Sequence, residues 1–286
     1  MCRVFGFHGE SSADVTALIR ALLLVEAEDN PHGTGIVIKR GGKNLLCKKG
    51  VQAHSFLVKG YADFLWGEKY QYALGHVRFM TNGEQTDRNA HPFGFRVHGK
   101  WHFGIHNGVI LRDAELADEF GVRVANVDSE TLFRCIAVLQ NKGHKVVDAI
   151  ERVTHFVSSR GNFALAYMTE SEIFLWRDNQ RPLWVFDCRK HGMGMFFAST
   201  PQMFARAWEW ACPSRDFSRV SCFETRPYRL YRMAGGKIEV VKDLKHETFD
   251  YWSVFLQKEN RPDVFGKGMI NTFPKENKKG GLDHYI

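Results

Sequence analysis

Several features that define other protein classes are missing from this sequence of 286 residues. No run approaches the roughly 18 consecutive apolar residues of a membrane span, and the start lacks the charged and then apolar regions of a signal peptide. The six cysteines include no C-x-x-C pair, which argues against a zinc ribbon and a dithiol redox motif. Phosphate-loop and dinucleotide-binding glycine motifs are also missing. We therefore expect a cytoplasmic protein with no metal site and no cofactor.

The composition is that of a folded globular chain, with 44% hydrophobic and 25% charged residues. Residues 1–244 carry regular apolar patterns and are expected to form one domain. The pattern fades in residues 245–286, which form a C-terminal arm that we expect to be partly extended or mobile. An aromatic cluster at Phe249, Tyr251, Trp252 and Phe255 suggests that the arm docks on a partner.

The net charge of +7 is concentrated in one part of the chain. Residues 177–232 contain ten Arg or Lys residues and five Asp or Glu residues, and Arg dominates the basic set. No helix-turn-helix, RNP or zinc-finger pattern accompanies the charge, so nucleic-acid binding is not expected. A solvated basic face is the simpler interpretation, and a face for an acidic partner or a phosphorylated acceptor is the alternative.

Hydrophobic periodicity predicts an α+β protein in which paired sheets are covered by helices. One helix should follow the N-cap residues Ser11-Ser12, and three others should span Asp128–Asn141, Val146–Val157 and Gln202–Trp210. Strands are predicted over residues 2–8, Thr34–Lys39, Asn44–Cys47, Tyr72–Val77, Trp101–His106, Phe163–Met168, Glu172–Trp176, Leu183–Phe186, Met193–Ala198, Tyr228–Met233 and Lys237–Val241. The long polar stretch between Val77 and Trp101 is expected to be an ordered functional loop.

Cys2 stands directly behind the initiator methionine. Removal of Met1 would leave an N-terminal thiol beside a free α-amino group, whose reference pKa is about 7.7–8.0. Such an amine can accept the thiol proton near neutral pH, so no separate histidine is required. Taken alone, a cysteine at this position is a weak signal. The other five cysteines are expected to stay reduced and packed.

Four motifs follow Cys2 in a fixed order: residues 75–83 (GHVRFMTNG), residues 89–92 (NAHP), residues 106–108 (HNG) and residues 128–131 (DSET). With these motifs, residues 2–244 resemble the class II glutamine amidotransferases, in a form without a second enzymatic domain. The resemblance implies a four-layer αββα sandwich of two mainly antiparallel sheets, as in the N-terminal-nucleophile hydrolases. Gly33-Thr34-Gly35 and Asp178–Leu183 match two turns of the family scaffold.

The resemblance also assigns roles to the residues in the motifs. Catalysis would fall to Cys2 as nucleophile and to Asn107 and Gly108 as donors to the oxyanion, and glutamine would be bound by Arg78, Thr81 and Asp128. Phe79, Asn82, His91 and His106 would support the site, with His91 bracing the long loop; Phe79 and Asn82 stand where the family often has Trp and His. Two simpler interpretations remain open: Asn107-Gly108 as a tight turn, and Asp128 as a helix N-cap.

The implied function is hydrolysis of the glutamine side-chain amide through a thioester on Cys2, which gives glutamate and ammonia. The residues beyond 244 are too few for an acceptor domain, so a separate synthetase or transferase chain is expected to receive the ammonia. Two alternatives remain: a related amidase or acylase acting on another amide, and a catalytically inactive binding protein. The sequence also leaves a homo-oligomer open.

Overall fold

The computed structural model describes residues 2–25, 27, 29–81 and 83–247. The described residues belong to one compact unit, Met1–Phe249, whereas the second unit, Asp250–Ile286, lies outside them. The predicted arm and its aromatic cluster therefore stay predictions, as does a domain boundary at residue 244.

Two antiparallel sheets form the centre of the compact unit. The first sheet has seven strands in the order β11-β9-β10-β1-β4-β2-β3, and the second has six in the order β13-β12-β8-β7-β6-β5. The first consists of β1 (Arg3–His8), β2 (Gly33–Arg40), β3 (Lys43–Lys49), β4 (Tyr72–Arg78), β9 (Trp184–Asp187), β10 (Met195–Ala198) and β11 (Ser221–Glu224). The second consists of β5 (Phe93–Val97), β6 (Lys100–Ile110), β7 (Gly161–Met168), β8 (Ile173–Arg177), β12 (Arg229–Ala234) and β13 (Lys237–Asp243).

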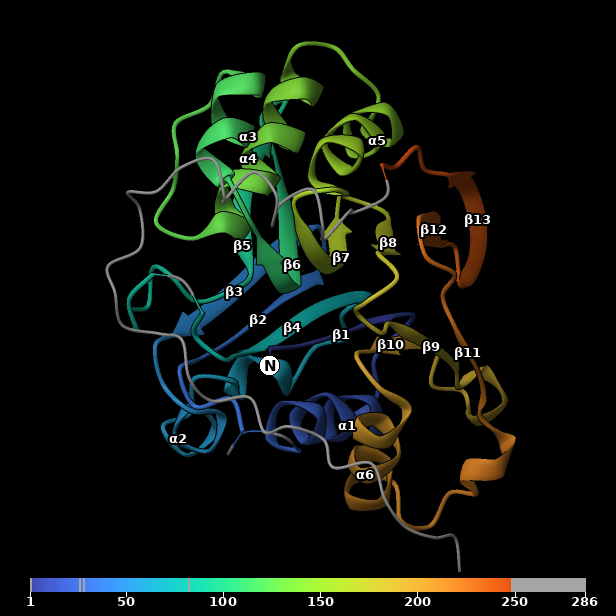
Figure 1. Cartoon of the computed structure of the whole chain (residues 1–286). Coiled ribbons are helices and arrows are strands. Elements are labelled where there is room, and N and C mark those ends of the chain that lie inside the picture. The colour runs from blue at the N-terminus through green and yellow to red at the C-terminus, as the bar shows by residue number, and fades with distance from the viewer. Residues whose placement is uncertain (1, 26, 28, 82, 248–286) are drawn as a thin grey trace, which may run out of the picture. The chain divides into compact units, whose positions relative to one another are not determined.

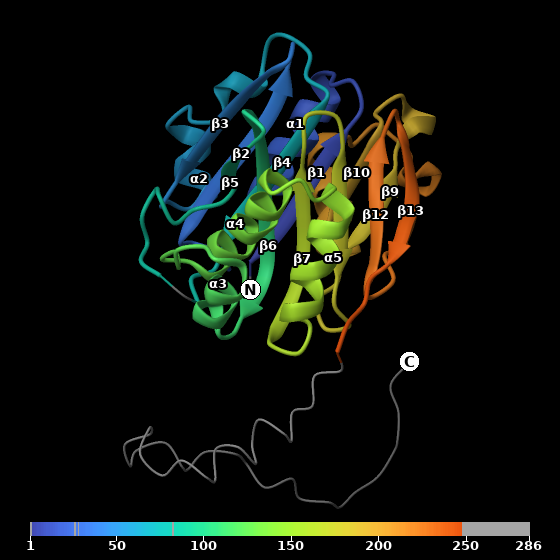
Figure 2. The same cartoon turned by 90° about the horizontal axis from the view of Figure 1, so that it is seen from above.

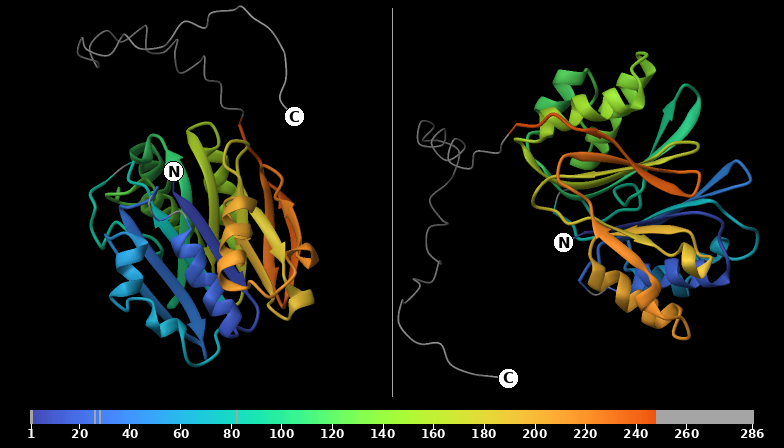
Figure 3. Two further views of the ribbon diagram at one scale, coloured as in Figure 1. Left: turned by 90° about the horizontal axis from the view of Figure 1, so that it is seen from below. Right: turned by 90° about the vertical axis from the view of Figure 1, so that its right-hand side faces the viewer.

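Helices cover the outer face of each sheet (Figure 1). The first sheet is covered by α1 (Ala13–Leu24), α2 (Ala53–Val58) and α6 (Pro201–Ala211), and the second by α3 (Asp113–Phe120), α4 (Asp128–Asn141) and α5 (Val146–Val157). Figure 2 shows α4 and α5 lying across the second sheet, and Figure 3 shows the four layers from the side. The predicted αββα sandwich is confirmed. No described helix is long and apolar enough to cross a membrane.

Three apolar clusters hold the layers together, as expected when each sheet buries both faces. The first joins the outer face of the first sheet to α1, α2 and α6, and the second joins the outer face of the second sheet to α3, α4 and α5. The third cluster fills the space between the sheets and includes Val4, Leu74 and Ile105. Because side chains alternate along a strand, these three residues identify which other side chains face the inter-sheet layer.

Most predicted helices and strands agree well with the structure. The side chain of Ser12 accepts a hydrogen bond from the N–H of Val15 as the N-cap of α1, and α4 and α5 have the predicted bounds. Strands β2 and β3 pair around the Gly41-Gly42 turn. Two described α-helices and two described strands were not predicted: α2, α3, β5 and β11. Strand β5 lies within the stretch that was expected to be loop, where Phe93 and Val97 are buried as it pairs with β6.

Two smaller expectations were wrong. Gly33-Thr34-Gly35 is the start of strand β2 and does not form a turn. The side chain of Cys222 is exposed on the edge strand β11, so it is not packed in the core as expected. By contrast, Asp178–Leu183 does form a turn, in which the Asp178 carboxylate accepts hydrogen bonds from the backbone N–H groups of Gln180 and Arg181.

Candidate active site

Cys2 immediately precedes the central strand β1 and lies against the end of β4. Arg3 pairs with Val77 in the sheet, which places Cys2 beside Arg78. The sulfur lies 3.2 Å from the carbonyl oxygen of Phe79 and accepts a hydrogen bond from the Phe79 N–H at 3.3 Å. Because Cys2 is two residues before Val4, the alternation of β1 directs its side chain toward the inter-sheet layer.

Arg78 ends strand β4 and shares that layer. It stands four residues after Leu74, on the same face of the strand, and its side chain is 2% exposed. The guanidinium donates to the carbonyl oxygen of Glu84 at 3.0 Å, so the loop after β4 curls over it. The neighbouring strand β2 places Gly33 opposite Arg78 and Gly35 opposite His76. A Cβ on Gly35 would lie 2.0 Å from the carbonyl oxygen of His91, so only glycine lets the His91 backbone pass between the sheets.

Asn107 and Gly108 lie within strand β6, where they pair with Ala164 and Phe163 of β7. The interpretation of this dipeptide as a tight turn is therefore wrong. Asn107 is two residues from Ile105 and faces the inter-sheet layer, where it is 2% exposed. Its side-chain oxygen has no hydrogen-bond partner in the described part of the chain. A buried polar atom without a partner is costly, and a bound ligand or water can satisfy it.

Asp128 is the first residue of α4, and its N-cap is Val127, so the N-cap interpretation of Asp128 is also wrong. The carboxylate instead accepts a hydrogen bond from the N–H of Ile110 at 2.6 Å, at the end of β6. It is 3% exposed. This bond connects the start of α4 to the strand that carries Asn107 and Gly108.

Opposing influences act on the pKa of the Cys2 thiol. Burial raises the pKa, the Phe79 N–H and the positive charge of Arg78 lower it, and the negative charge of Asp128 raises it. Burial has the largest effect, so the net result is a pKa above the ordinary thiol value. The thiol is therefore mainly protonated near neutral pH, and a nucleophilic role requires a base to remove its proton.

Phe79 and Thr81 follow Arg78 at the surface. The ring of Phe79 is 40% exposed and meets the edge of His32 at 5.3 Å between ring centroids. Thr81 is exposed, and Asn82 lies outside the described residues. The loop from Glu84 to Ala90 is ordered by its own contacts, including a hydrogen bond from the Asn89 side chain to the Glu84 carbonyl at 3.0 Å.

His91 and His106 are both buried, together with His76, for which no role was predicted. The rings of His76 and His91 stack with centroids 4.0 Å apart, and His76 Nε2 lies 2.9 Å from the carbonyl oxygen of His106. His76 lies two residues before Arg78 in the same motif, on the same face of β4. This two-residue spacing from Arg78 is the sequence feature that could have identified His76 as a residue near the site. Burial lowers the pKa of His76 to about 3 and that of His91 well below its usual range.

These depressed pKa values predict acid sensitivity. An unfolded histidine binds a proton below about pH 6.5, whereas buried His91 stays neutral, so stability is lost as the pH falls below 6.5. Between pH 7 and pH 5 the loss is about 2 kcal/mol for each such histidine. We expect His91→Gln to lose about 2 kcal/mol less than the wild type over that interval, measured by urea unfolding at both pH values. An equal decline in both proteins would contradict the prediction.

His102 and His106 lie on one face of β6, as their spacing predicts, yet they have different partners. His102 Nδ1 lies 3.1 Å from the hydroxyl of Tyr167, and His106 Nδ1 lies 2.7 Å from the hydroxyl of Ser129. Within the described ranges, no three His, Cys, Asp or Glu side chains are grouped to hold a metal ion.

The arginine-rich span 177–232 contains many internal ion pairs. Arg177 pairs with Glu224 at 2.9 Å, and Arg189 pairs with Asp187 at 2.6 Å. Further pairs are Arg215–Asp14, Arg229–Asp243, Arg232–Glu172 and Arg232–Glu239. Charges already paired within the chain favour the interpretation as a solvated face over that of a phosphate-binding face.

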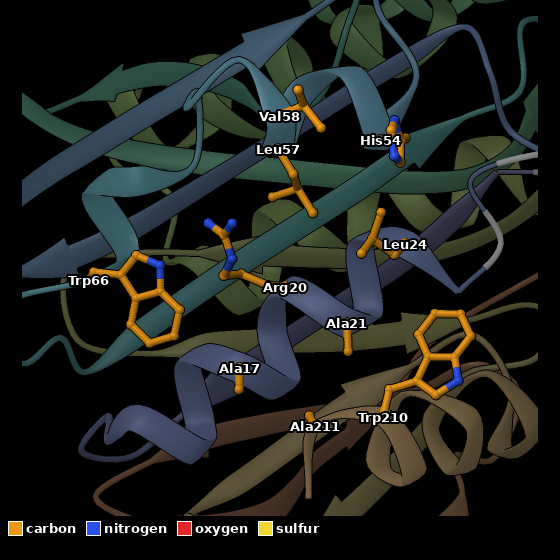
Figure 4. Close-up of a pocket in the computed structure, with 10 residues that line it drawn as sticks. All are labelled: Ala17, Arg20, Ala21, Leu24, His54, Leu57, Val58, Trp66, Trp210 and Ala211. Atoms are coloured by element: carbon orange, nitrogen blue, oxygen red, sulfur yellow. The ribbon is translucent and has the colours of Figure 1, made fainter.

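A pocket of about 510 Å³ lies away from Cys2, on the outer helical layer of the first sheet (Figure 4). It is lined by α1, α2 and α6 and includes the rings of Trp66 and Trp210. None of the predicted site residues lines it. The pocket lining is mainly apolar, and it contains neither a nucleophile nor a pair of opposite charges for an amino-acid substrate.

The two facing sheets, with a cysteine at the start of a central strand, define the N-terminal-nucleophile hydrolase fold. The family description "Glutamine amidotransferases class-II" matches residues 1–191. The chain belongs to this family, whose members are enzymes that hydrolyse the side-chain amide of glutamine.

Curated relatives and solved structures are consistent with this family assignment. The chain is 32% identical over 176 residues to glutamine–fructose-6-phosphate aminotransferase of Aquifex aeolicus, covering 60% of this chain and 28% of that protein. It is 28% identical over 211 residues to the chloroplastic amidophosphoribosyltransferase 2 of Arabidopsis thaliana, covering 70% and 35%. It therefore spans about a third of these relatives. The fold matches the glutamine phosphoribosylpyrophosphate amidotransferase of B. subtilis, with a TM-score of 0.67, 22% identity and coverage of 84% and 49%. It also matches a class-II domain protein of Silicibacter pomeroyi, with a TM-score of 0.53, 19% identity and coverage of 85% and 99%.

Proposed function

We propose that this protein hydrolyses the side-chain amide of glutamine to glutamate and ammonia, with Cys2 as the nucleophile once Met1 is removed. One observation carries the proposal. Cys2 directly precedes β1, Arg78 ends β4 and Asn107 lies within β6, and the alternation of each strand turns these side chains toward the same inter-sheet layer. The charges of Arg78 and Asp128 both act on the Cys2 thiol, which supports their placement in one site.

The charged groups suit an amino acid. Glutamine carries an α-carboxylate and an α-ammonium group, and a specific site needs one cation and one anion to hold them. Arg78 is the candidate for the carboxylate because its planar guanidinium can bind two oxygens at once. Asp128 is the candidate for the ammonium group, and Thr81 is the candidate for a further contact from the loop. A simple amide carries neither charge and would make no use of Arg78 or Asp128, which disfavours the general amidase alternative.

The reaction begins when the α-amino group of Cys2 accepts the thiol proton, directly or through a water molecule. The sulfur attacks the amide carbon, and the oxygen of the tetrahedral intermediate receives hydrogen bonds from the Asn107 side chain and the Gly108 N–H. The C–N bond then breaks as the amine returns the proton, so ammonia leaves and a thioester forms. Water attacks the thioester, which releases glutamate and regenerates the thiol.

The elevated pKa of the Cys2 thiol makes this base essential. The amine must be neutral to accept a proton, so kcat/KM should rise as the pH increases through its pKa, which has a reference value of about 7.7–8.0. Phe79, Asn82, His91 and His106 would act indirectly. Phe79 bonds to the sulfur through its backbone, and His91 and His106 support the strands and the loop around it.

We further propose that the ammonia reaches a synthetase or transferase on another chain, in the cytoplasm. The curated relatives are named for aminotransferase and phosphoribosyltransferase reactions. These names support the chemical class of the acceptor enzyme. We propose no oligomeric state.

The decisive experiment measures glutamate and ammonia released from glutamine by the purified protein, together with its intact mass. Equal amounts of both products and a mass lower by one methionine support the proposal. Release from other amides but not from glutamine would favour the amidase alternative. Retention of Met1 with no product would favour a catalytically inactive binding protein.

A chain that ends at Glu247 is expected to keep its glutaminase activity and its free energy of unfolding. The ring of His246 stacks on Tyr228 with centroids 3.9 Å apart, and the Glu247 N–H donates to Ser158 at 2.8 Å. A chain that ends at Lys245 loses both contacts and should be about 1 kcal/mol less stable. Urea unfolding of the two truncated proteins measures this difference. Failure of the longer one to fold would show that residues 248–286 belong to the core.

A further inference from the structure

Gly108 packs unusually closely against the neighbouring strand β7. Its φ of 150° lies in the region that disfavours other residues. A Cβ at this position would lie 2.0 Å from the backbone oxygen of Asn162 and 2.7 Å from His106 Nε2. The position of the Gly108 backbone is therefore set largely by where the Asn162 carbonyl stands.

Asn162 is held in turn by Arg181. The Arg181 Nε donates to the side-chain oxygen of Asn162 at 2.6 Å. Arg181 belongs to the turn built by Asp178, whose carboxylate accepts the Arg181 N–H at 2.8 Å. The N–H of Asp178 bonds to the carbonyl oxygen of Phe163 at 2.9 Å, which ties the turn to the residue that pairs with Gly108. Asp178 is 1% exposed, whereas Asn162 and Arg181 are partly exposed.

A second set of contacts approaches the same segment from α4. His106 Nε2 lies 3.4 Å from the carbonyl oxygen of Asn162, and its Nδ1 lies 2.7 Å from the Ser129 hydroxyl. Asp128, next to Ser129, accepts the Ile110 N–H. Residues 106–110 are thus held from the β7 side through Asn162 and from the helix side through Asp128 and Ser129.

We propose that Asn162 and Arg181 are positioning residues for the Gly108 backbone N–H. This inference rests on the proposed function, in which that N–H stabilises the oxyanion. Neither residue needs to touch glutamine. Arg181 restrains the Asn162 side chain, the Asn162 backbone confines Gly108, and the donor is thereby aimed before the substrate binds. Donors that are oriented in advance stabilise developing charge without reorganising during the reaction.

Steady-state kinetics of Asn162→Ala and Arg181→Ala in the full chain test the proposal. Misplacement by about 1 Å can cost on the order of 100-fold in rate, so we expect kcat to fall by about 10- to 100-fold, with KM changed by less than about threefold. The double variant should lose little more than the worse single variant, since the two act as one unit. Asn162→Asp keeps an acceptor for Arg181 and should restore most of kcat.

Two further measurements separate positioning from general damage. The rate of Cys2 alkylation by iodoacetamide needs no oxyanion donor and should match that of the wild type. Arg189→Ala, an exposed arginine in the same span, is the matched control and should retain full activity. If Asn162→Ala does not fold, Arg181→Lys, which keeps the charge but loses the Nε donor, must still lower kcat. If the wild type hydrolyses glutamine and the variants have the same kcat, the inference is overturned. If the wild type itself does not hydrolyse glutamine, the proposed function is overturned.

Discussion

Replacement of Cys2 by alanine should abolish glutamine hydrolysis. Removal of the nucleophile from an enzyme that forms a covalent intermediate costs on the order of 10⁶-fold in kcat, because the whole reaction path through that intermediate is lost. The side chain of Cys2 is only half-buried, so the variant should fold with nearly unchanged stability. Ammonia and glutamate release, measured beside circular dichroism, checks both expectations.

Cys222→Ala is the matched control because that thiol is exposed and lies on the edge strand β11. It should retain full activity. Cys2→Ser keeps an N-terminal nucleophile of lower reactivity and should be far slower than the wild type. Turnover by Cys2→Ala near the wild-type rate would refute both the nucleophile assignment and the thioester route.

Asn107→Ala should lower kcat by about 100- to 1000-fold while glutamine still binds. Loss of one oxyanion donor typically has this effect, because the interaction forms fully only when charge develops on the oxygen. KM should therefore change little. Asn107 is buried in β6, and its backbone pairs with Ala164 of β7. Alanine should therefore fit the strand without disturbing this pairing.

Steady-state kinetics with glutamine tests this assignment, with Asn44→Ala on the edge strand β3 as a control. Asn107→Asp is a sharper variant. It preserves the size of the side chain but replaces the N–H donor with a negative charge, so it should be at least as damaging as alanine. A variant that raised KM and left kcat intact would instead show that Asn107 contributes uniform ground-state binding.

Local patterns were sufficient for much of the fold. The Ser12 cap and the apolar stripes of α4 and α5 depend on neighbouring residues, and each appears where it was predicted. Short elements were missed for a physical reason. Strands β5 and β11 have few residues and little periodicity, so only pairing with β6 and β9 makes them strands.

For the candidate site, too, the sequence identified the residues, whereas the tertiary structure determined their surroundings. The ordered motifs pointed to Cys2, Arg78, Asn107 and Asp128, but the local environments assumed for two of them were wrong. Asn107-Gly108 has the composition of a turn, yet pairing with β7 keeps it extended. Asp128 has the composition of an N-cap, yet its carboxylate bonds to Ile110. In both cases a strand outside the local segment supplied the partner.

The ordered motifs in the sequence pointed to the family, and that resemblance implied the layered architecture and the nucleophile candidate. The sequence sufficed for this because each motif is a short stretch of neighbouring residues. Register between strands decided the rest. It set Cys2 beside Arg78, stacked His76 on His91, and pressed Asn162 against Gly108, which lies more than fifty positions earlier. The first and third of these contacts come from strands paired within one sheet, and the second lies between the sheets. No local pattern encodes which distant residues will meet in either way.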